Sequence, residues 1–211
     1  MRSAIVHVVD DDASIRDSLR VLLEASGYAV ATYGTATEFL VAAPFTTGGC
    51  VLTDIRMPDL GGLELQDRLS SREPRLPVVV MTGQGDVALA VRAMKAGAVD
   101  FLEKPFDDRQ LLDAVERALQ QSRTTEESYR RAAAAIHKLS GLTPREREVL
   151  GMLIAGLPTK AIANRLGASP RTIEVHRARV FGKLDADTLP EIVRIAQAAG
   201  VTPMEETPVA E

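Results

Sequence analysis

Short apolar runs alternate with amphipathic segments along the first 120 residues. Five runs have the length and composition of buried strands, and we expect strands at residues 5–9, 28–33, 49–54, 77–82 and 98–102. Between them, apolar residues recur at helical spacing, which predicts helices up to Gly27, over residues 35–43, 62–71 and 86–96, and from about residue 107. The pattern therefore predicts five strand–helix units.

Alternating strands and helices are typical of a parallel sheet covered on both faces. We predict a flavodoxin-like, doubly wound α/β domain over residues 1–121, with strand order 2-1-3-4-5. In this order the topological switch point lies between the first and third strands, and ligands bind outside the carboxyl ends of the strands at that point.

Carboxylates follow the two strands that flank this switch point. Asp10 and Asp11 end the first strand, and Asp54 ends the third. The runs that end in these aspartates contain no compensating arginine. A few hard carboxylate oxygens suit a Mg²⁺ ion that keeps several waters. We predict a magnesium site made by the three aspartates and the backbone carbonyl of Arg56.

Two further groups are expected at the same edge. Thr82 ends the fourth strand and Lys104 follows the fifth. A carboxylate nucleophile, a lysine and a hydroxyl that hold phosphoryl oxygens, and a metal together suit phosphoryl transfer. Phosphatases of the haloacid-dehalogenase type need a second aspartate two residues after the nucleophile, where this chain has Arg56, so that class is disfavoured.

These motifs resemble the receiver domain of two-component response regulators. The resemblance rests on the acidic pair, the run Asp54-Ile55-Arg56-Met57-Pro58, Thr82 and Lys104-Pro105. It implies that a histidine kinase phosphorylates Asp54, that Asp11 ligates Mg²⁺ directly, and that the Lys104-Pro105 peptide bond is cis. It also implies that Thr82 moves towards the phosphoryl group while Phe101 turns inward behind it.

The back of the chain has a different pattern. Residues 122–141 contain no proline and no glycine before Gly141, which predicts a helical linker. Thr143-Pro144 and Ser169-Pro170 each place a capping residue before a proline at the first helical position. A short helix is also expected over residues 159–166. This helix, the tight turn over residues 167–169 and the helix that begins at Pro170 indicate a helix-turn-helix domain over residues 142–200.

The helix that begins at Pro170 has an apolar and a polar face. Ile173, Val180, Phe181 and Leu184 are expected to pack inward, and the other face can enter the major groove of DNA. For His176 a phosphate contact and a core-capping role stay open. The predicted DNA-binding residues are Lys160, Arg171, Thr172, Glu174, Val175, His176, Ala178, Arg179 and Lys183.

This segment is similar to LuxR-type DNA-binding domains in the runs over residues 142–150 and 169–176. The similarity implies a structural role for Glu146 and a fourth helix over residues 189–199 that supports dimer contact. In the runs over residues 97–106 and 171–175, the chain resembles FixJ-type response regulators. This resemblance implies promoter DNA and RNA polymerase as partners, nitrogen-fixation or microaerobic target genes, and a FixL-like haem oxygen sensor as the kinase.

Charge agrees with this division. Residues 1–121 contain 18 acids and 12 bases, whereas residues 143–200 contain 6 acids and 9 bases, which indicates a metal or phosphoryl site followed by a polyanion-binding domain.

Cys50 is the single cysteine, which excludes an internal disulfide, and we expect it to be a buried apolar residue. His7 is expected to have a structural role. We expect no signal peptide and no membrane span, a cytoplasmic protein, and a disordered tail over residues 201–211.

The main hypothesis is a non-enzymatic transcription activator that promotes only its own phosphoryl transfer and slow dephosphorylation. Phosphorylation would produce a homodimer through a face that includes Ala88, Val91, Lys95 and Ala98. The alternative is a phosphoryl sink or adaptor whose helical domain binds a protein. Steep salt dependence of binding would favour DNA over a protein partner.

Overall fold

The computed structural model of the chain describes residues 4–43, 48–72, 75–83 and 87–202, and the predicted tail lies mostly outside this part. The residues form two compact units, 1–127 and 128–211. The elements of the first unit are β1 (Ile5–Val9), α1 (Ala13–Ala25), β2 (Ala29–Tyr33), α2 (Ala36–Ala42), β3 (Gly49–Asp54), α3 (Gly62–Ser70), β4 (Val78–Thr82), α4 (Val87–Lys95), β5 (Asp100–Glu103) and the start of α5 (Asp108–Ser140).

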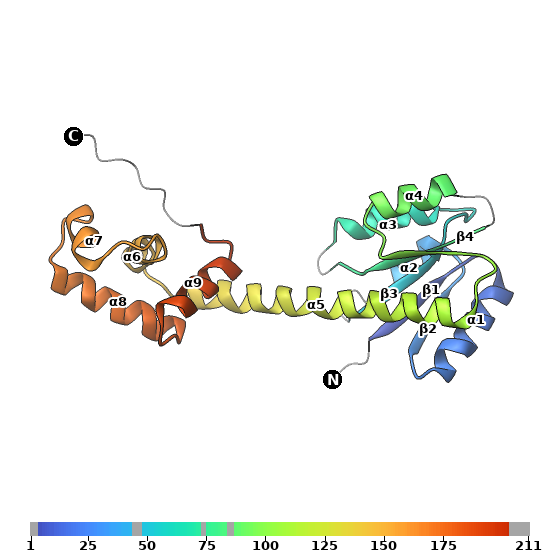
Figure 1. Cartoon of the computed structure of the whole chain (residues 1–211), viewed down its shortest axis with the longest axis horizontal. Helices are drawn as coiled ribbons and strands as arrows, with labels where there is room; N and C mark the ends of the chain where they lie inside the picture. The colour runs from blue at the N-terminus through green and yellow to red at the C-terminus, as the bar shows by residue number, and fades with distance from the viewer. Residues whose placement is uncertain (1–3, 44–47, 73–74, 84–86, 203–211) are drawn as a thin grey trace. The chain divides into compact units, whose positions relative to one another are not determined.

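The five strands form one parallel sheet in the order β2-β1-β3-β4-β5, as predicted. The apolar residues of the strands alternate between two cores. One core lies beneath α2, α3 and α4 and includes Val51 and Val80, while the other lies beneath α1 and α5 and includes Leu52 and Met81 (Figure 1). Both faces of the sheet are covered, which explains why its central strands are almost wholly apolar.

The expected strand at residues 98–102 is shifted in the structure. β5 begins at Asp100, because the backbone amide of Ala98 bonds to the carbonyl oxygen of Ala93 and completes the turn that follows α4. Gly97 adopts a φ of 91° in this turn, a conformation that glycine reaches without a Cβ penalty. The side chain of Ala98 is only 7% exposed. Ala98 is therefore a core residue and offers almost no surface to the predicted dimer face.

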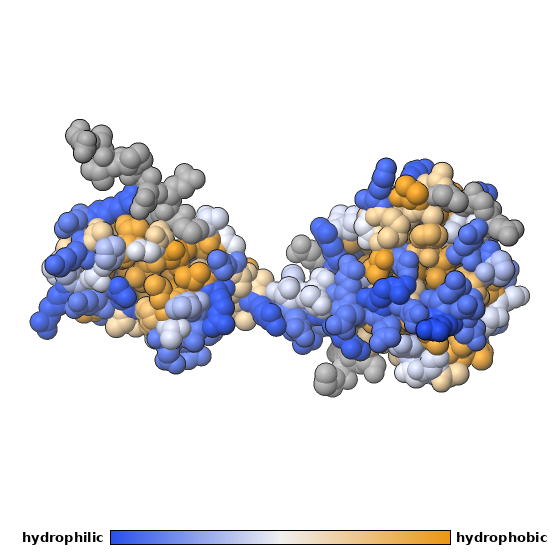
Figure 2. Space-filling view, viewed as in Figure 1, coloured by the Kyte–Doolittle hydropathy of each residue, from blue (hydrophilic) through white to orange (hydrophobic). Residues whose placement is uncertain are grey.

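The predicted helical linker continues the last helix of the first unit. α5 extends without interruption from Asp108 to Ser140, and its exposed side is hydrophilic in the first unit (Figure 2). Ser122 is buried, and its hydroxyl accepts a hydrogen bond of 3.1 Å from the amide of Gly49 at the start of β3. This contact explains why the first unit extends beyond residue 121.

The second unit is helical. After the end of α5 it contains α6 (Pro144–Ile154), α7 (Thr159–Arg165), α8 (Pro170–Leu184) and α9 (Leu189–Ala198). Both predicted cap-and-proline starts are present: Thr143 forms a capping box with Glu146, and the Ser169 hydroxyl accepts from the amide of Thr172. Ile173, Val180 and Leu184 are buried, and Phe181 is partly buried and packs against the same core, as expected.

His7 and Cys50 are both buried, as expected for a structural histidine and a buried apolar cysteine. Nδ1 of His7 lies 3.2 Å from the Tyr33 hydroxyl, and burial lowers the pKa of His7 to about 4, so its ring is neutral at physiological pH. Burial raises the pKa of Cys50 to about 12, which makes its thiol unreactive. Within the described residues, no helix has the length and apolar character that a membrane span requires.

Close backbone packing at Gly62 gives a first prediction. A Cβ at this position would lie 2.3 Å from the carbonyl oxygen of Asp54, whereas at Gly61 the nearest backbone atom is 3.2 Å away. We expect Gly62→Ala to lower the free energy of unfolding by about 1–3 kcal/mol, because β3 or α3 must move. Gly61→Ala, the control, should cost less. Equal denaturant midpoints for Gly62→Ala and the wild type would contradict this packing.

Candidate functional site

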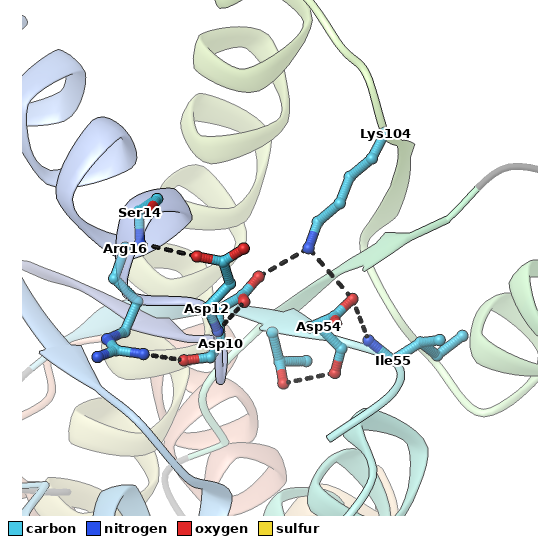
Figure 3. A network of polar contacts seen from close by, with 8 residues as sticks. Asp10, Asp12, Ser14, Arg16, Asp54, Ile55 and Lys104 are labelled. Atoms are coloured by element: carbon cyan, nitrogen blue, oxygen red, sulfur yellow. Dashed lines mark hydrogen bonds and ion pairs between the residues drawn. The ribbon is translucent and has the colours of Figure 1, made fainter. Parts of the chain in front are cut away.

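The carboxyl edge of the sheet brings together the predicted phosphoryl site. Asp10 follows β1, Asp54 ends β3, and Lys104 follows β5 (Figure 3). Nζ of Lys104 lies 2.7 Å from Oδ2 of Asp10 and 3.4 Å from Oδ1 of Asp54. One ammonium group therefore lies between two carboxylates from strands on either side of the switch point and neutralises part of their charge.

The third predicted carboxylate lies beside these two. Oxygen atoms of Asp10, Asp11 and Asp54 all lie within 4.8 Å of one another. Asp10 is buried, Asp54 is partly buried and Asp11 is exposed, so the cluster is open to solvent on one side. A small set of carboxylate oxygens with room for water fits Mg²⁺, which retains several of its waters in proteins. Asp12 is not part of this group, because it caps α1 by accepting from the amide of Ser14.

Burial has the largest effect on Asp54. It raises the pKa of the Asp54 carboxyl, while the neighbouring Lys104 opposes this shift and the Asp10 carboxylate adds to it. Oδ1 of Asp54 also accepts a hydrogen bond of 2.9 Å from the amide of Ile55. The ionised carboxylate is therefore held in place but poorly solvated, a state that cations at the site would stabilise.

Arg16 is a neighbour of the site that sequence reasoning missed. Its Nη1 donates a 2.7 Å hydrogen bond to the carbonyl oxygen of Asp10, on the side away from Lys104 (Figure 3). The amide of Asp12 donates to Oδ1 of Asp10, so three groups fix this residue. The sequence could have predicted this contact, because a helix that starts after Asp12 places Arg16 one turn later, beside the end of β1.

Thr82 and Phe101 lie on the side of the site next to α4. Thr82 is buried and its hydroxyl donates to the carbonyl of Gly83, whereas the side chain of Phe101 is 42% exposed. Both line a hollow of about 430 Å³, together with Val91, Met94 and Lys95. The Lys104-Pro105 peptide bond is cis, as the resemblance implied.

Most of the predicted DNA-binding residues are exposed, and His176 and Lys183 differ from the others. Lys160 on α7 and most residues of the α8 set are exposed, and these are Arg171, Thr172, Glu174, Val175, Ala178 and Arg179. His176 is partly buried, with its Nδ1 atom buried and without a hydrogen-bond partner. Lys183 differs from the rest, because its ammonium lies 2.6 Å from Oε2 of Glu146 and so has a partner within the unit.

Glu146 has the structural role that the resemblance implied. Its side chain is 3% exposed, and its carboxylate accepts from Lys183 and from the amide of Thr143. These hydrogen bonds, with that of Lys183 the strongest, lower the pKa of Glu146 to about 2. Two further contacts that sequence reasoning missed hold α7: Arg177 donates to the Thr159 hydroxyl, and Arg145 donates to the carbonyl of Leu166.

Comparisons with known proteins found a matching family for each of the two units. Residues 6–116 match the family "Response regulator receiver domain", and residues 140–196 match "Bacterial regulatory proteins, luxR family". The transcriptional regulatory protein FixJ of Azorhizobium caulinodans is 49% identical over 201 residues, which is 95% of each chain. FixJ of Bradyrhizobium diazoefficiens is 47% identical over 196 residues, 93% of this chain and 96% of the relative.

The chain belongs to the FixJ-type two-component response regulators. It consists of a receiver domain and a LuxR-type DNA-binding domain, and it is a transcription regulator. The solved structure of the response regulator StyR is also similar, with 39% identity, a TM-score of 0.80, and coverage of 92% of this chain and 98% of that one.

The raised pKa of Asp54 gives a prediction about the stability of the receiver. A carboxyl whose pKa is higher in the folded than in the unfolded state destabilises the fold once it ionises. In metal-free buffer near neutral pH, we expect Asp54→Asn to raise the unfolding midpoint of the receiver, as measured by calorimetry. Adding Mg²⁺ should stabilise the wild type more than this variant. Asp67→Asn, on the exposed side of α3, is the control, and a lowered midpoint for Asp54→Asn without metal would contradict the assignment.

The low pKa of Glu146 gives a prediction for the DNA-binding domain. The pKa of Glu146 is about 2 in the folded domain, against an ordinary value of 4.5 that we take for the unfolded chain. Ionised Glu146 therefore stabilises the domain above pH 4.5, and this contribution is lost as the pH falls towards 2. Glu146→Gln should lower the unfolding midpoint at pH 7 and reduce its dependence on pH in this window. Glu148→Gln, on the same helix but half exposed, should change both much less. An unchanged pH profile in Glu146→Gln would count against the buried ion pair.

Proposed function

We propose that this regulator is a transcription activator controlled by phosphorylation of Asp54. A sensor histidine kinase is the proposed phosphoryl donor, and Mg²⁺ the proposed cofactor. The observation that carries the proposal is the position of Lys104, whose ammonium lies between Asp10 and Asp54 at the carboxyl edge of the sheet. No such cation would be needed to support a carboxylate that was merely solvated.

The residues present support in-line transfer to a carboxylate. An oxygen of Asp54 would attack the phosphorus of the donor phosphohistidine, forming the acyl phosphate as the phosphorus–nitrogen bond breaks. Lys104 would neutralise phosphoryl oxygens, and the Thr82 hydroxyl would hold one of them. Asp10, Asp11, Asp54 and the backbone carbonyl of Arg56 would hold Mg²⁺, which when bound supplies further neutralisation of negative charge.

The hollow beside α4 supports a link from the site to the surface. Phe101 is exposed while Thr82 is buried, and both line the same hollow. Movement of Thr82 towards a phosphoryl group would give Phe101 room to turn inward, which would change the face formed by α4 and β5. We propose this face, including the exposed Ala88, Val91 and Lys95, as the surface through which two phosphorylated receivers form a homodimer.

The output is proposed to be promoter binding through α8. A dimer would place two α8 helices on two half-sites and raise affinity through effective concentration. Since FixJ proteins are among the most similar relatives, we propose nitrogen-fixation or microaerobic genes as targets, a FixL-like haem oxygen sensor as the kinase, and RNA polymerase as a partner at the promoter. The chain would act in the cytoplasm and would catalyse no reaction beyond its own phosphorylation and slow dephosphorylation.

Phosphorylation-dependent dimerisation gives the test of this proposal. Treatment with acetyl phosphate and Mg²⁺ is expected to shift the wild type from monomer to dimer in sedimentation velocity, and Asp54→Asn is expected to stay monomeric. Asp67→Asn should behave as the wild type, since its side chain lies on the exposed side of α3. Full dimerisation of the Asp54→Asn protein under the same conditions would disprove the mechanism.

A further inference from the structure

A lysine from α5 contacts the end of the proposed recognition helix. Nζ of Lys138 donates a 2.7 Å hydrogen bond to the carbonyl oxygen of Leu184, the last residue of α8. The same ammonium lies 3.6 Å from the carboxylate of Asp185. Lys138 belongs to the last turns of α5, which are part of the second unit. The contact therefore lies within the DNA-binding domain but comes from the helix that leads into it.

The end of α8 is a place where such a contact matters. The last carbonyl groups of a helix have no intrahelical donors, and a cation there also stabilises the negative end of the helix dipole. Asp185 follows with a φ of 52°, the one non-glycine residue with a positive φ in the described part of the chain. Its amide bonds to the carbonyl of Gly182, so the chain turns sharply where Lys138 binds.

Apolar packing fixes the same two elements. Leu184 is buried in a core cluster with Leu142, Leu150, Val180 and Ile192, and Leu139 of α5 packs against this cluster. The neighbouring Lys183 ammonium bonds to the buried Glu146 carboxylate on α6. The last turn of α8 is thus held by two ammonium groups, one that reaches in from α5 and one that reaches out to α6.

The consequence concerns the opposite end of α8. The helix is a rigid element, so the place where its last turn is held sets the direction in which its exposed residues, such as Arg171 and Val175, point. Base contacts depend on this direction far more than phosphate contacts do, because hydrogen bonds to base edges require defined geometry whereas phosphate attraction acts over a distance.

We propose that Lys138 is a positioning residue for DNA recognition, which orients α8 from the end of α5 without itself contacting DNA. The inference rests on the proposed role of α8 as the helix that reads DNA. It predicts that loss of the Lys138 hydrogen bond weakens binding to a specific sequence while non-specific binding stays unchanged.

The test compares full-length Lys138→Met and Lys138→Arg with the wild type, all treated with beryllofluoride and Mg²⁺. The probes are a labelled duplex that the wild-type chain selects from a random-sequence pool and a scrambled duplex of the same composition. By fluorescence anisotropy, Lys138→Met should bind the selected duplex at least about tenfold more weakly, the lower end of the effect expected for one lost hydrogen bond to a charged group. The affinity of Lys138→Met for the scrambled duplex and the salt dependence of this binding should match those of the wild type. Lys138→Arg should bind the selected duplex as tightly as the wild type does. Arg123→Met, which removes one positive charge from α5 elsewhere, is the control.

Three results would overturn the proposal. Equal losses on both duplexes, with the slope of log affinity against log salt reduced by about 0.9, would show that Lys138 contacts a phosphate. Unchanged affinity for the selected duplex would show that the contact does not orient α8. Unfolding of the second unit in both Lys138 variants, followed by calorimetry, would show a purely structural role.

A separate variant distinguishes failure of this inference from failure of the proposed function. Val175→Glu places a carboxylate on the exposed face of α8. If the selected duplex still binds this variant as it binds the wild type, α8 is not the reading helix and the proposed function is wrong. If Val175→Glu loses binding while Lys138→Met does not, only the role of Lys138 is refuted.

Discussion

The structure depends on one electrostatic constraint, the crowding of three carboxylates at the switch point of a parallel sheet. Strand order brings Asp10, Asp11 and Asp54 together, and burial raises the pKa of Asp54. Lys104, which follows β5, offsets part of this cost, and Arg16 fixes the backbone of Asp10 from α1. Such a site favours whatever brings further positive charge to it, which is the condition that a metal-dependent phosphoryl acceptor requires.

Much of the fold followed from the sequence, because periodicity reports burial directly. The mostly apolar runs of β3 and β4 are buried on both sheet faces, and the proline-containing starts of α6 and α8 are local features that need no tertiary information. The start of β5 was misplaced by two residues. There the backbone amide of Ala98 completes the turn after α4, and no side-chain pattern encodes that hydrogen bond.

The candidate site was predicted where residue type and strand ends coincide, and missed where long side chains cross between elements. Sequence position places Lys104 at the sheet edge, but it does not reveal that Arg177 reaches Thr159 or that Lys138 reaches Leu184. Lys183 shows the same effect, since a basic residue on α8 was predicted to contact DNA and has an acidic partner within its own unit. The charge of this unit therefore serves both its own fold and its surface.

The central claim is that the state of Asp54 controls DNA binding by α8, and one measurement tests it most directly. The affinity for a labelled promoter duplex would be measured by anisotropy with and without beryllofluoride and Mg²⁺, in the wild type and in Asp54→Asn. We expect at least about tenfold tighter binding by the treated wild type, a change of about 1.4 kcal/mol, and no change in the variant. Equal affinity of the treated and untreated wild type would contradict it.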